Sequence, residues 1–366
     1  MENPQKSKCR QHRNGEAVGT LCKPLCIEKQ IHSLSCHAFH VGKEAVFSAE
    51  WGESKLVFKA SSSANEVDPV YWFDRQNEKQ YPTEAEFDSM IRDVVASKLN
   101  FTISVDQLRR LGQFGYSRAK ESSTLRHTEM QNIWFLLHDN EYLNCALYSD
   151  REAFPQLLGT CGSFFAVEYV DPVRSYTRML EISDGREEWV TQIKLAIMIM
   201  DLLDEIETNF PEPFHLCDIK MSHFGLAKGG QRLKFLDLDS VFPRTIAGRI
   251  TADGSHCTKH KDCDFFDCRS HCNKVTNRCS SPVSNNNLQI VCEKIFVGWK
   301  LSGTVILPGL LMSQHTPSSL AALLRICANP NSESNTPRAA VPEDIRRRLY
   351  VTLTEMYQGL ANEVFE

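Results

Sequence analysis

Apolar residues along the chain follow strand spacing first and helix spacing next. Residues 45–59, AVFSAEWGESKLVFK, predict two strands joined by a tight turn at Gly52-Glu53. A helix is predicted to begin after Pro82-Thr83, because apolar residues then recur about every 3.6 positions. These apolar residues are Phe87, Ile91, Val94, Val95 and Leu99. We therefore expect the first part of the chain to combine a sheet with a helix.

The rest of the pattern predicts further strands, one long apolar helix and a helical C-terminal part. Residues 100–130 are polar and are expected to be irregular, and a second helix is expected around Asn132–Tyr148. The segments FPQLLGT and SFFAVEYV predict two more strands. Residues 187–208 predict a strongly apolar helix that crosses the core, and residues 290–366 predict two or three further helices.

The cysteine content indicates an oxidising compartment. The chain has 366 residues and 14 cysteines, most of which lie in two clusters. The clusters are Cys9, Cys22, Cys26 and Cys36, then Cys257, Cys263, Cys268, Cys272, Cys279 and Cys292. Such density is typical of disulfide-bonded secretory proteins, and an even count is compatible with complete pairing. The sequon Asn100-Phe101-Thr102 agrees with a glycosylated protein of the secretory pathway.

Charge and hydropathy restrict the partners of the chain. A net charge of −5 without a long basic run argues against a nucleic-acid partner. The first 30 residues contain no apolar segment typical of a signal peptide. No apolar run reaches the ~18 residues of a membrane span. If the protein is secretory, we expect its targeting segment or membrane anchor upstream of this chain; a cytosolic form with reduced cysteines is the alternative.

The segment from Phe214 to Phe242 carries the strongest candidate chemistry. Asp218 is followed two residues later by Lys220, and Asp237 comes directly after the apolar strand LKFL. Phosphoryl transfer uses two such carboxylates: one accepts the proton of the substrate hydroxyl, and the other holds a metal ion on the nucleotide phosphates. We predict Asp218 as the base, with Lys220 placed to neutralise the transferring phosphoryl group. A loop with a local salt bridge is the alternative.

The predicted metal site departs from the usual kinase pattern. His223 stands where a metal-binding Asn is usual, and Asp237-Leu238-Asp239 replaces D-F-G. We expect Asp237 to be the main ligand, with Asp239 supporting a second ion. Magnesium prefers oxygen ligands, whereas imidazole suits manganese or zinc. Either His223 therefore binds a different ion or one metal site is lost, and a histidine that only forms hydrogen bonds in the loop is the plainer alternative.

Lys59 is the candidate for holding the nucleotide phosphates. It ends the strand LVFK, in the V-x-x-A…K order that Val46 and Ala49 complete. A kinase lysine at this position pairs with a helix glutamate. We predict Glu86 as this partner rather than Glu84, although either glutamate is also explained by the favourable charge at a helix N-terminus.

Two other parts of a nucleotide site are less complete. Residues 166–170, AVEYV, resemble the hinge between kinase lobes, where backbone groups bind adenine, so Glu168 is predicted to lie beside the nucleotide. The glycine-rich loop expected before the first of these strands is reduced to Gly42, because Phe39, Val41 and Glu44 occupy the glycine positions. The sequence therefore predicts weaker contacts to the phosphates from this loop.

The second cysteine cluster favours disulfides over zinc. It contains His256, His260 and His271, but no C-x-x-C pair and no spacing typical of a zinc finger or ribbon. The cluster follows Asp237, where a kinase has its activation segment. Disulfides there would order the segment without phosphorylation.

These motifs together resemble the FAM69-type divergent protein kinase domain family. The similar parts are GTLCKPLC, VFSAEW…LVFK, PQLLGTCGSFFAVEYV, DIKMSHFGL…LDLDSVF and the spaced cysteines of the insert. The resemblance covers most of residues 19–360. It implies a kinase-like two-lobe fold and retention in the endoplasmic reticulum, and members of this family usually have an N-terminal membrane anchor.

The resemblance also implies an inserted EF-hand-like loop that binds calcium. The corresponding residues near 112–134 lack the carboxylates of such a loop, and residues 74–86 are a poorer substitute. Calcium is therefore not expected as a cofactor.

We predict an α+β, protein-kinase-like two-lobe fold with a β-rich N-lobe and a helical C-lobe. The expected domains are a cysteine-rich N-terminal extension at 1–40, an N-lobe at 41–170 and a C-lobe at 171–366 with its insert at 257–292. The predicted function is transfer of phosphate from ATP, with Mg or Mn, to a protein or glycan hydroxyl in the endoplasmic reticulum. The alternative is a pseudokinase that acts as a binding or scaffold module.

Overall fold

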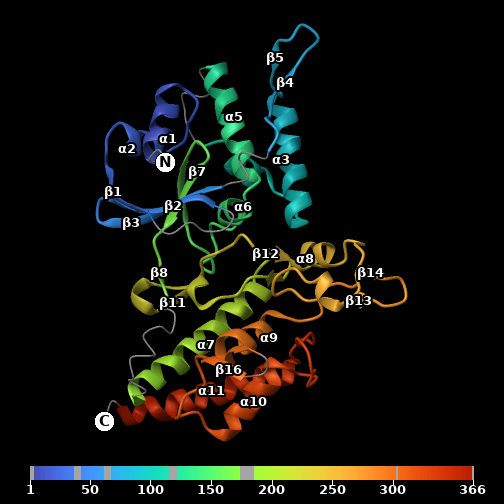
Figure 1. Cartoon of the computed structure of the whole chain (residues 1–366). Coiled ribbons are helices and arrows are strands. Elements are labelled where there is room, and N and C mark those ends of the chain that lie inside the picture. Colours follow the sequence, from blue (N-terminus) through green and yellow to red (C-terminus); the bar gives the residue numbers. More distant parts are fainter. Residues whose placement is uncertain are drawn as a thin grey trace. The chain divides into compact units, whose positions relative to one another are not determined.

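The computed structural model divides the chain into two compact units (Figure 1). The first unit contains residues up to Val170 together with Asp237–Asp239, and the second contains Asp171–Leu236 and Ser240–Glu366. The structure describes residues 4–36, 43–61, 67–114, 122–173, 185–301 and 304–364. Each unit is described by itself below.

The first unit is built on a five-stranded antiparallel sheet with strand order β1-β2-β3-β7-β6. Its strands are β1 (Ile31–Cys36), β2 (Lys43–Trp51), β3 (Ser54–Ser61), β6 (Leu157–Cys161) and β7 (Phe164–Glu168). Gly52 adopts φ +60° in the turn between β2 and β3, which confirms the predicted hairpin. Phe47 and Phe58 stack with ring centroids 5.0 Å apart, so the two strands also share a buried aromatic core.

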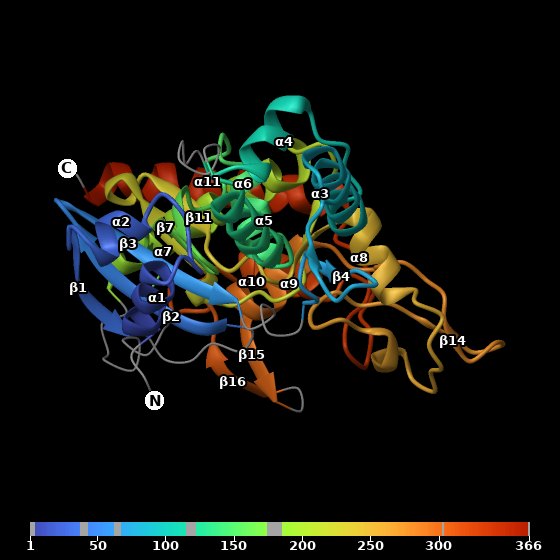
Figure 2. The same cartoon turned by 90° about the horizontal axis from the view of Figure 1, so that it is seen from above.

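Two short helices are covalently stapled to this sheet, as the cysteine-rich N-terminus predicts. They are α1 (Pro4–Arg13) and α2 (Cys22–Cys26). The disulfide Cys9–Cys26 joins the two helices, and Cys22–Cys161 joins α2 to β6. Leu25 packs among the buried residues of β1–β3, and Figure 2 shows α1 and α2 beside these strands.

The helices of the first unit partly correct the predicted pattern. They are α3 (Glu84–Leu99), α4 (Val105–Gly112), α5 (Ser123–Leu137) and α6 (Asn140–Leu147), and a small hairpin of β4 (Trp72–Phe73) and β5 (Lys79–Gln80) precedes them. The predicted helix after Thr83 is confirmed, because the Thr83 side chain caps α3. The prediction of irregular structure at 100–130 is wrong, because Ser104 caps another helix, α4, there. The single helix predicted at 132–148 is also wrong, because Asp139 caps a separate helix after α5 ends.

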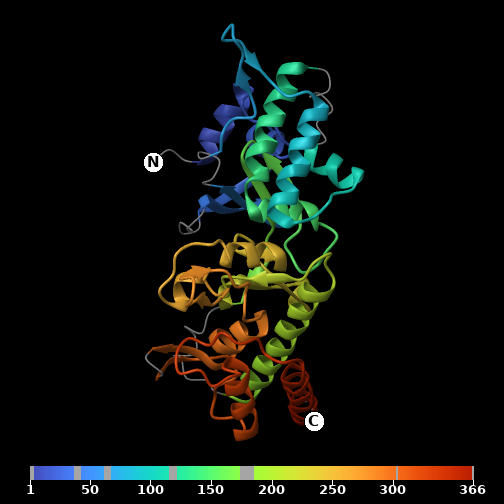
Figure 3. The same cartoon turned by 90° about the vertical axis from the view of Figure 1, so that its right-hand side faces the viewer.

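The second unit is mostly helical, with short antiparallel strand pairs. Its helices are α7 (Arg186–Thr208), α8 (Arg244–Thr251), α9 (Asn287–Val291), α10 (Ser318–Ala328) and α11 (Glu343–Val364), with the π-helix η7 (Cys292–Val297) after α9. The predicted apolar helix is confirmed as α7, and it packs against α11 (Figure 3). The helices predicted within residues 290–366 are confirmed as α10 and α11. Among the helices that the structure describes, none is both long and apolar enough to span a bilayer.

The strands of the second unit frame the segment with the candidate chemistry. They are β8 (Asp171–Pro172), β9 (Phe214–Leu216), β10 (Phe224–Ala227), β11 (Arg232–Phe235), β12 (Val241–Pro243), β13 (Cys272–Asn273), β14 (Arg278–Cys279), β15 (Gly298–Leu301) and β16 (Thr304–Pro308). Strand β10 lies between β11 and β8, and β9 pairs with β12. Because β9 and β10 flank residues 217–223, these strands fix both ends of the loop that holds Asp218.

Disulfides organise the cysteine-rich insert. The pairs in this unit are Cys217–Cys268, Cys257–Cys272, Cys263–Cys279 and Cys292–Cys327. The preference for disulfides over zinc is therefore confirmed. The even number of cysteines does not mean complete pairing, because Cys36 is a free thiol. The irregular cysteine spacing of the insert has two causes. The bonds Cys257–Cys272 and Cys263–Cys279 overlap in sequence, and Cys268 and Cys292 pair with cysteines outside the insert.

Candidate active site

Lys59 on β3 forms an ion pair with Glu141 in the first turn of α6. The Lys59 side chain is 15% exposed and that of Glu141 is 1% exposed. Burying either charge alone is strongly unfavourable, so the pair fixes the position of both groups. A lysine–glutamate pair that joins a central strand to a helix is the arrangement that kinases use to hold nucleotide phosphates.

The predicted partner of Lys59 is wrong, because Glu86 serves a different purpose. Glu86 is exposed and accepts the backbone N–H of Thr83 at 2.8 Å, in a capping box at the start of α3. The hydrogen bonds from the Thr83 backbone and side chain lower the pKa of Glu86. Glu84 binds Arg126 instead. Glu141 was missed because the helix predicted at 132–148 continues through the point where α5 ends and α6 begins. The signal for a new helix start was Asp139 as a capping residue, followed by an acidic residue in the first turn.

The start of α6 also holds the peptide after Asp237. The side-chain amide of Asn140 donates to the carbonyl of Leu238 at 2.9 Å and to that of Asp239 at 3.2 Å. The backbone N–H of Asp239 donates to the Asp237 carboxylate at 3.3 Å. Within the first unit, consecutive residues of one helix therefore bind Lys59 and the peptide that carries Asp237.

Asp218 lies directly after β9 in a loop stabilised by its own neighbours. Lys220 Nζ lies 2.8 Å from Asp218 Oδ2. The side chain of Asp218 is 23% exposed and that of Lys220 is 58% exposed. An ion pair this accessible adds little stability. The pair leaves the carboxylate of Asp218 open to a substrate, with a cation beside it.

His223 is oriented by a hydrogen bond to the backbone of the same loop. Its Nδ1 lies 3.0 Å from the carbonyl oxygen of Asp218. A carbonyl only accepts, so Nδ1 is the donor in this hydrogen bond. Such a hydrogen bond to the second ring nitrogen is typical of metal-binding histidines.

The loop with Asp218 and His223 is hydrogen-bonded to the strand that leads to Asp237. The backbone N–H of Leu236 donates to the carbonyl of His223 at 2.7 Å, which places the next residue, Asp237, near the loop. Asp218 and His223 belong to one loop of the second unit, so a carboxylate and an imidazole occur together there. Together they offer oxygen and nitrogen as ligand atoms, whereas Mg²⁺ prefers oxygen ligands alone.

Another close group of ligand atoms does not form a metal site. The sulfurs of Cys257, Cys263 and Cys279 also lie within 4.8 Å of one another. All three belong to disulfides. Zinc binds thiolates, so these oxidised sulfurs are not its ligands.

Glu168 ends β7, and its backbone is partly engaged. Its N–H donates to the carbonyl of Gln156 at 2.9 Å, and the backbone N–H of the next residue, Tyr169, donates to the carbonyl of Lys55 at 3.2 Å. The Gln156 N–H donates to the Glu168 carboxylate at 2.8 Å rather than to its carbonyl. Adenine recognition by this segment would therefore have to use the Glu168 carbonyl or the amide of Val170.

Two of the predicted features fall partly or wholly outside the described residues. The glycine-poor loop up to Gly42 lies outside them. The EF-hand-like region near 112–134 is described except for residues 115–121, and it contains the end of α4 and most of α5. There the guanidinium of Arg126 binds the carboxylates of Glu84 and Glu129 and the carbonyl of Gly112.

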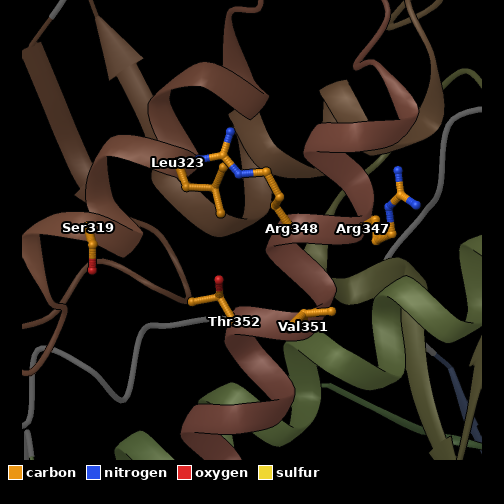
Figure 4. Close-up of a pocket in the computed structure, with 6 residues that line it drawn as sticks. All are labelled: Ser319, Leu323, Arg347, Arg348, Val351 and Thr352. Carbon is orange, nitrogen blue, oxygen red and sulfur yellow. The ribbon is translucent and has the colours of Figure 1, made fainter.

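A separate surface cavity of about 360 Å³ lies between α10 and α11 (Figure 4). It is lined by Ser319, Leu323, Arg347, Arg348, Val351 and Thr352. The side chains of Arg347 and Arg348 point in different directions, so they do not converge on one anion (Figure 4). The cavity contains none of the predicted site residues.

Comparison with known families agrees with this geometry. Residues 133–330 match a family model described as the protein-kinase domain of FAM69. Residues 2–112 match a model described as the cysteine-rich, endoplasmic-reticulum N-terminus of FAM69. The chain belongs to the FAM69 family.

Membership in FAM69 confirms the predicted α+β, kinase-like two-lobe fold. The kinase-domain match includes Glu141, Asp218 and Asp237, whereas Lys59 lies within the N-terminal match. The FAM69 protein therefore combines a kinase-like domain with a disulfide-bonded N-terminus of a type found in the endoplasmic reticulum.

Proposed function

We propose that this FAM69 protein is a kinase of the endoplasmic reticulum lumen that transfers the γ-phosphoryl group of ATP to a protein or glycan hydroxyl. The observation that carries the proposal is the buried pair between Lys59 and Glu141. Removing a lysine and a glutamate from water costs free energy, so such a pair is uncommon unless it serves a function. Kinases use this arrangement to hold the nucleotide phosphates.

The other residues supply the remaining requirements of phosphoryl transfer. Asp218 is exposed enough to accept a proton from a hydroxyl, and Lys220 beside it stabilises charge on the phosphoryl group. Asp237 holds the divalent ion on the phosphates, and Asp239 supports a second ion. The end of β7 at Glu168 binds adenine through its backbone.

The ligand set favours manganese as the ion that accompanies ATP. The hydrogen bond from Nδ1 to the Asp218 carbonyl orients the His223 ring, and in this proposal His223 joins the carboxylates of Asp218 and Asp237 as a ligand of the ion. Nitrogen ligands raise the affinity for Mn²⁺ relative to Mg²⁺, which prefers oxygen and retains its water. We therefore place Mn²⁺ ahead of Mg²⁺ as the cofactor.

The lumenal location is supported by the oxidised cysteines and by a surface sequon. Six disulfides occur among the described residues. Asn100 of the sequon is exposed at the end of α3, where an oligosaccharyltransferase can reach it. Both features belong to a protein that folds in an oxidising compartment.

A pseudokinase scaffold is the second candidate, and the replacement of the usual Asn by His223 favours it. Both candidates are tested on protein expressed through the secretory pathway with its disulfides intact. We expect ATP with MnCl₂ to raise the melting temperature of the wild type, and Lys59→Met to abolish that increase. Transfer of labelled phosphate to acceptor peptides or glycans then supports the kinase. Stabilisation without transfer supports the scaffold. The absence of both stabilisation and transfer would contradict nucleotide binding by this protein.

A further inference from the structure

Both residues that flank Asp218 are fastened to one dipeptide of the cysteine-rich insert. Cys217, directly before Asp218, forms a disulfide with Cys268. Ile219, directly after it, donates its backbone N–H to the Asp267 carboxylate at 2.8 Å. The backbone N–H of Asp267 donates to the carbonyl of Cys217 at 2.7 Å. We call these four residues, Cys217, Ile219, Asp267 and Cys268, the loop clamp.

The insert side of the loop clamp is anchored independently of the Asp218 loop. Lys294 on η7 lies with its Nζ 2.6 Å from Asp267 Oδ2. The side-chain amide of Asn285 donates to the carbonyl of Asp267 at 2.9 Å. The disulfide Cys292–Cys327 ties η7 to α10. Asp267 is therefore held by contacts from two directions besides those of the loop clamp.

Burial keeps these bonds away from competing water. Cys217, Ile219 and Cys268 are at most 1% exposed, and the Asp267 side chain is 13% exposed. Hydrogen bonds in such surroundings are stronger than exposed ones. Asp218 itself is 23% exposed, so the loop clamp restrains the backbone on both sides of an accessible carboxylate.

We propose that Asp267 and the Cys217–Cys268 disulfide are positioning elements for Asp218. The proposal rests on the proposed function, in which Asp218 is the base. A misplacement of about 1 Å costs about a hundredfold in rate, so a base gains from a fixed backbone. Many kinases order the activation segment with a phosphate group that binds arginine. In this chain the cysteine-rich insert follows Asp237 as an activation segment does, and it is fixed to the Asp218 loop by a disulfide and two hydrogen bonds instead.

The Asp267 arm of the loop clamp is tested with three variants of one ion pair. Asp267→Ala removes the acceptor of the Ile219 N–H, Asp267→Asn keeps an oxygen acceptor, and Lys294→Met removes only the cation. We expect Asp267→Ala to speed hydrogen exchange of the Ile219 amide by about tenfold and to lower kcat by about tenfold, with KM for ATP unchanged. Asp267→Asn is expected to retain most of both. Equal effects of Asp267→Asn and Asp267→Ala would indicate a role of charge alone and would overturn the positioning role.

The disulfide arm has a matched control in the same insert. We expect Cys217→Ser with Cys268→Ser to lower kcat by about a hundredfold and to deprotect the amides of residues 217–219. Removing Cys257–Cys272 by the same double substitution is expected to leave both readings unchanged. Should the first double variant fail to fold, Asp267→Ala still tests the proposal. Wild-type kcat and wild-type exchange in folded Asp267→Ala overturn it.

Failure of the proposed function and failure of the loop clamp give different results. A wild-type protein that transfers no phosphate contradicts the proposed function. Hydrogen exchange at Ile219 is measured without any substrate. Unchanged exchange in folded Asp267→Ala therefore overturns the loop clamp whatever the activity of the wild type.

Discussion

Lys59 and Glu141, which lie on β3 and α6, form a buried ion pair inside the first unit. The neighbouring residue Asn140 binds the carbonyls of Leu238 and Asp239. The start of one helix thus orients the Lys59 ammonium group and holds the peptide that follows Asp237. This relationship makes the start of α6 the structural centre of the nucleotide site that we propose.

Loss of the buried glutamate is expected to harm both stability and nucleotide binding. Glu141→Ala leaves the Lys59 ammonium buried without this carboxylate, so the free energy of unfolding should fall by about 3–5 kcal/mol. The increase in melting temperature caused by ATP and MnCl₂ should also be lost. Glu86→Ala is the control, because Glu86 is exposed and caps α3. We expect a smaller loss of stability and wild-type nucleotide binding for Glu86→Ala, and the reverse order of effects would contradict the assignment of Glu141.

His223 is expected to set the preference between metal ions. His223→Asn replaces nitrogen by oxygen, so the affinity for Mn²⁺ should fall by about tenfold or more while that for Mg²⁺ rises or holds. Titration of each ion in the presence of a non-hydrolysable ATP analogue measures both affinities. An unchanged ratio of the two affinities would show that His223 only stabilises its loop through the hydrogen bond to Asp218.

Arg126 is expected to make the first unit independent of calcium. Its guanidinium binds the carboxylates of Glu84 and Glu129, so these two carboxylates already have a cationic partner. Adding Ca²⁺ or a chelator should leave the melting temperature of the wild type unchanged. Arg126→Ala should lower the free energy of unfolding by about 3 kcal/mol, since it leaves Glu129 buried without its cation. A calcium-dependent melting temperature in the wild type would refute this account.

His215 on β9 is expected to make stability fall in acid. Burial, followed by the nearby Arg244 charge, lowers the pKa of His215 from 6.5 to about 4. The unfolded chain binds a proton below about pH 6.5 while the folded chain does not, so stability is complete above pH 6.5 and is lost as the pH falls toward 4. The contribution is about 3 kcal/mol. Denaturant titrations between pH 7 and 4 should show a smaller loss for His215→Gln, and equal losses would exclude His215 as the cause.

The sequence was sufficient for elements whose signals are local. The β2–β3 hairpin follows from alternation and a glycine turn, α3 from the cap at Thr83, and α7 from a long apolar period. The chemistry of Asp218 and Asp237 is predicted from a motif, and the Asp218→Asn variant described below tests the role of Asp218.

The features that the sequence did not predict depend on contacts between distant residues. The helix break at His138-Asp139 has a capping signal, but the apolar pattern on both sides concealed it. The partner of Lys59 was predicted wrongly because a salt bridge between residues far apart in the sequence follows no fixed spacing that could be recognised. Disulfides were expected in the insert, whereas the bond from Cys268 to Cys217 beside the base is visible only in three dimensions.

The most direct test of the account compares phosphate transfer by the wild type and by Asp218→Asn. Both proteins are oxidised, saturated with γ-labelled ATP and MnCl₂, and given the same hydroxyl acceptor. We predict transfer by the wild type and a loss of about 10²–10⁴-fold in Asp218→Asn, with the nucleotide-dependent increase in melting temperature retained. Equal transfer by the two proteins, or no transfer by a wild type whose disulfides are intact, would contradict the central claim.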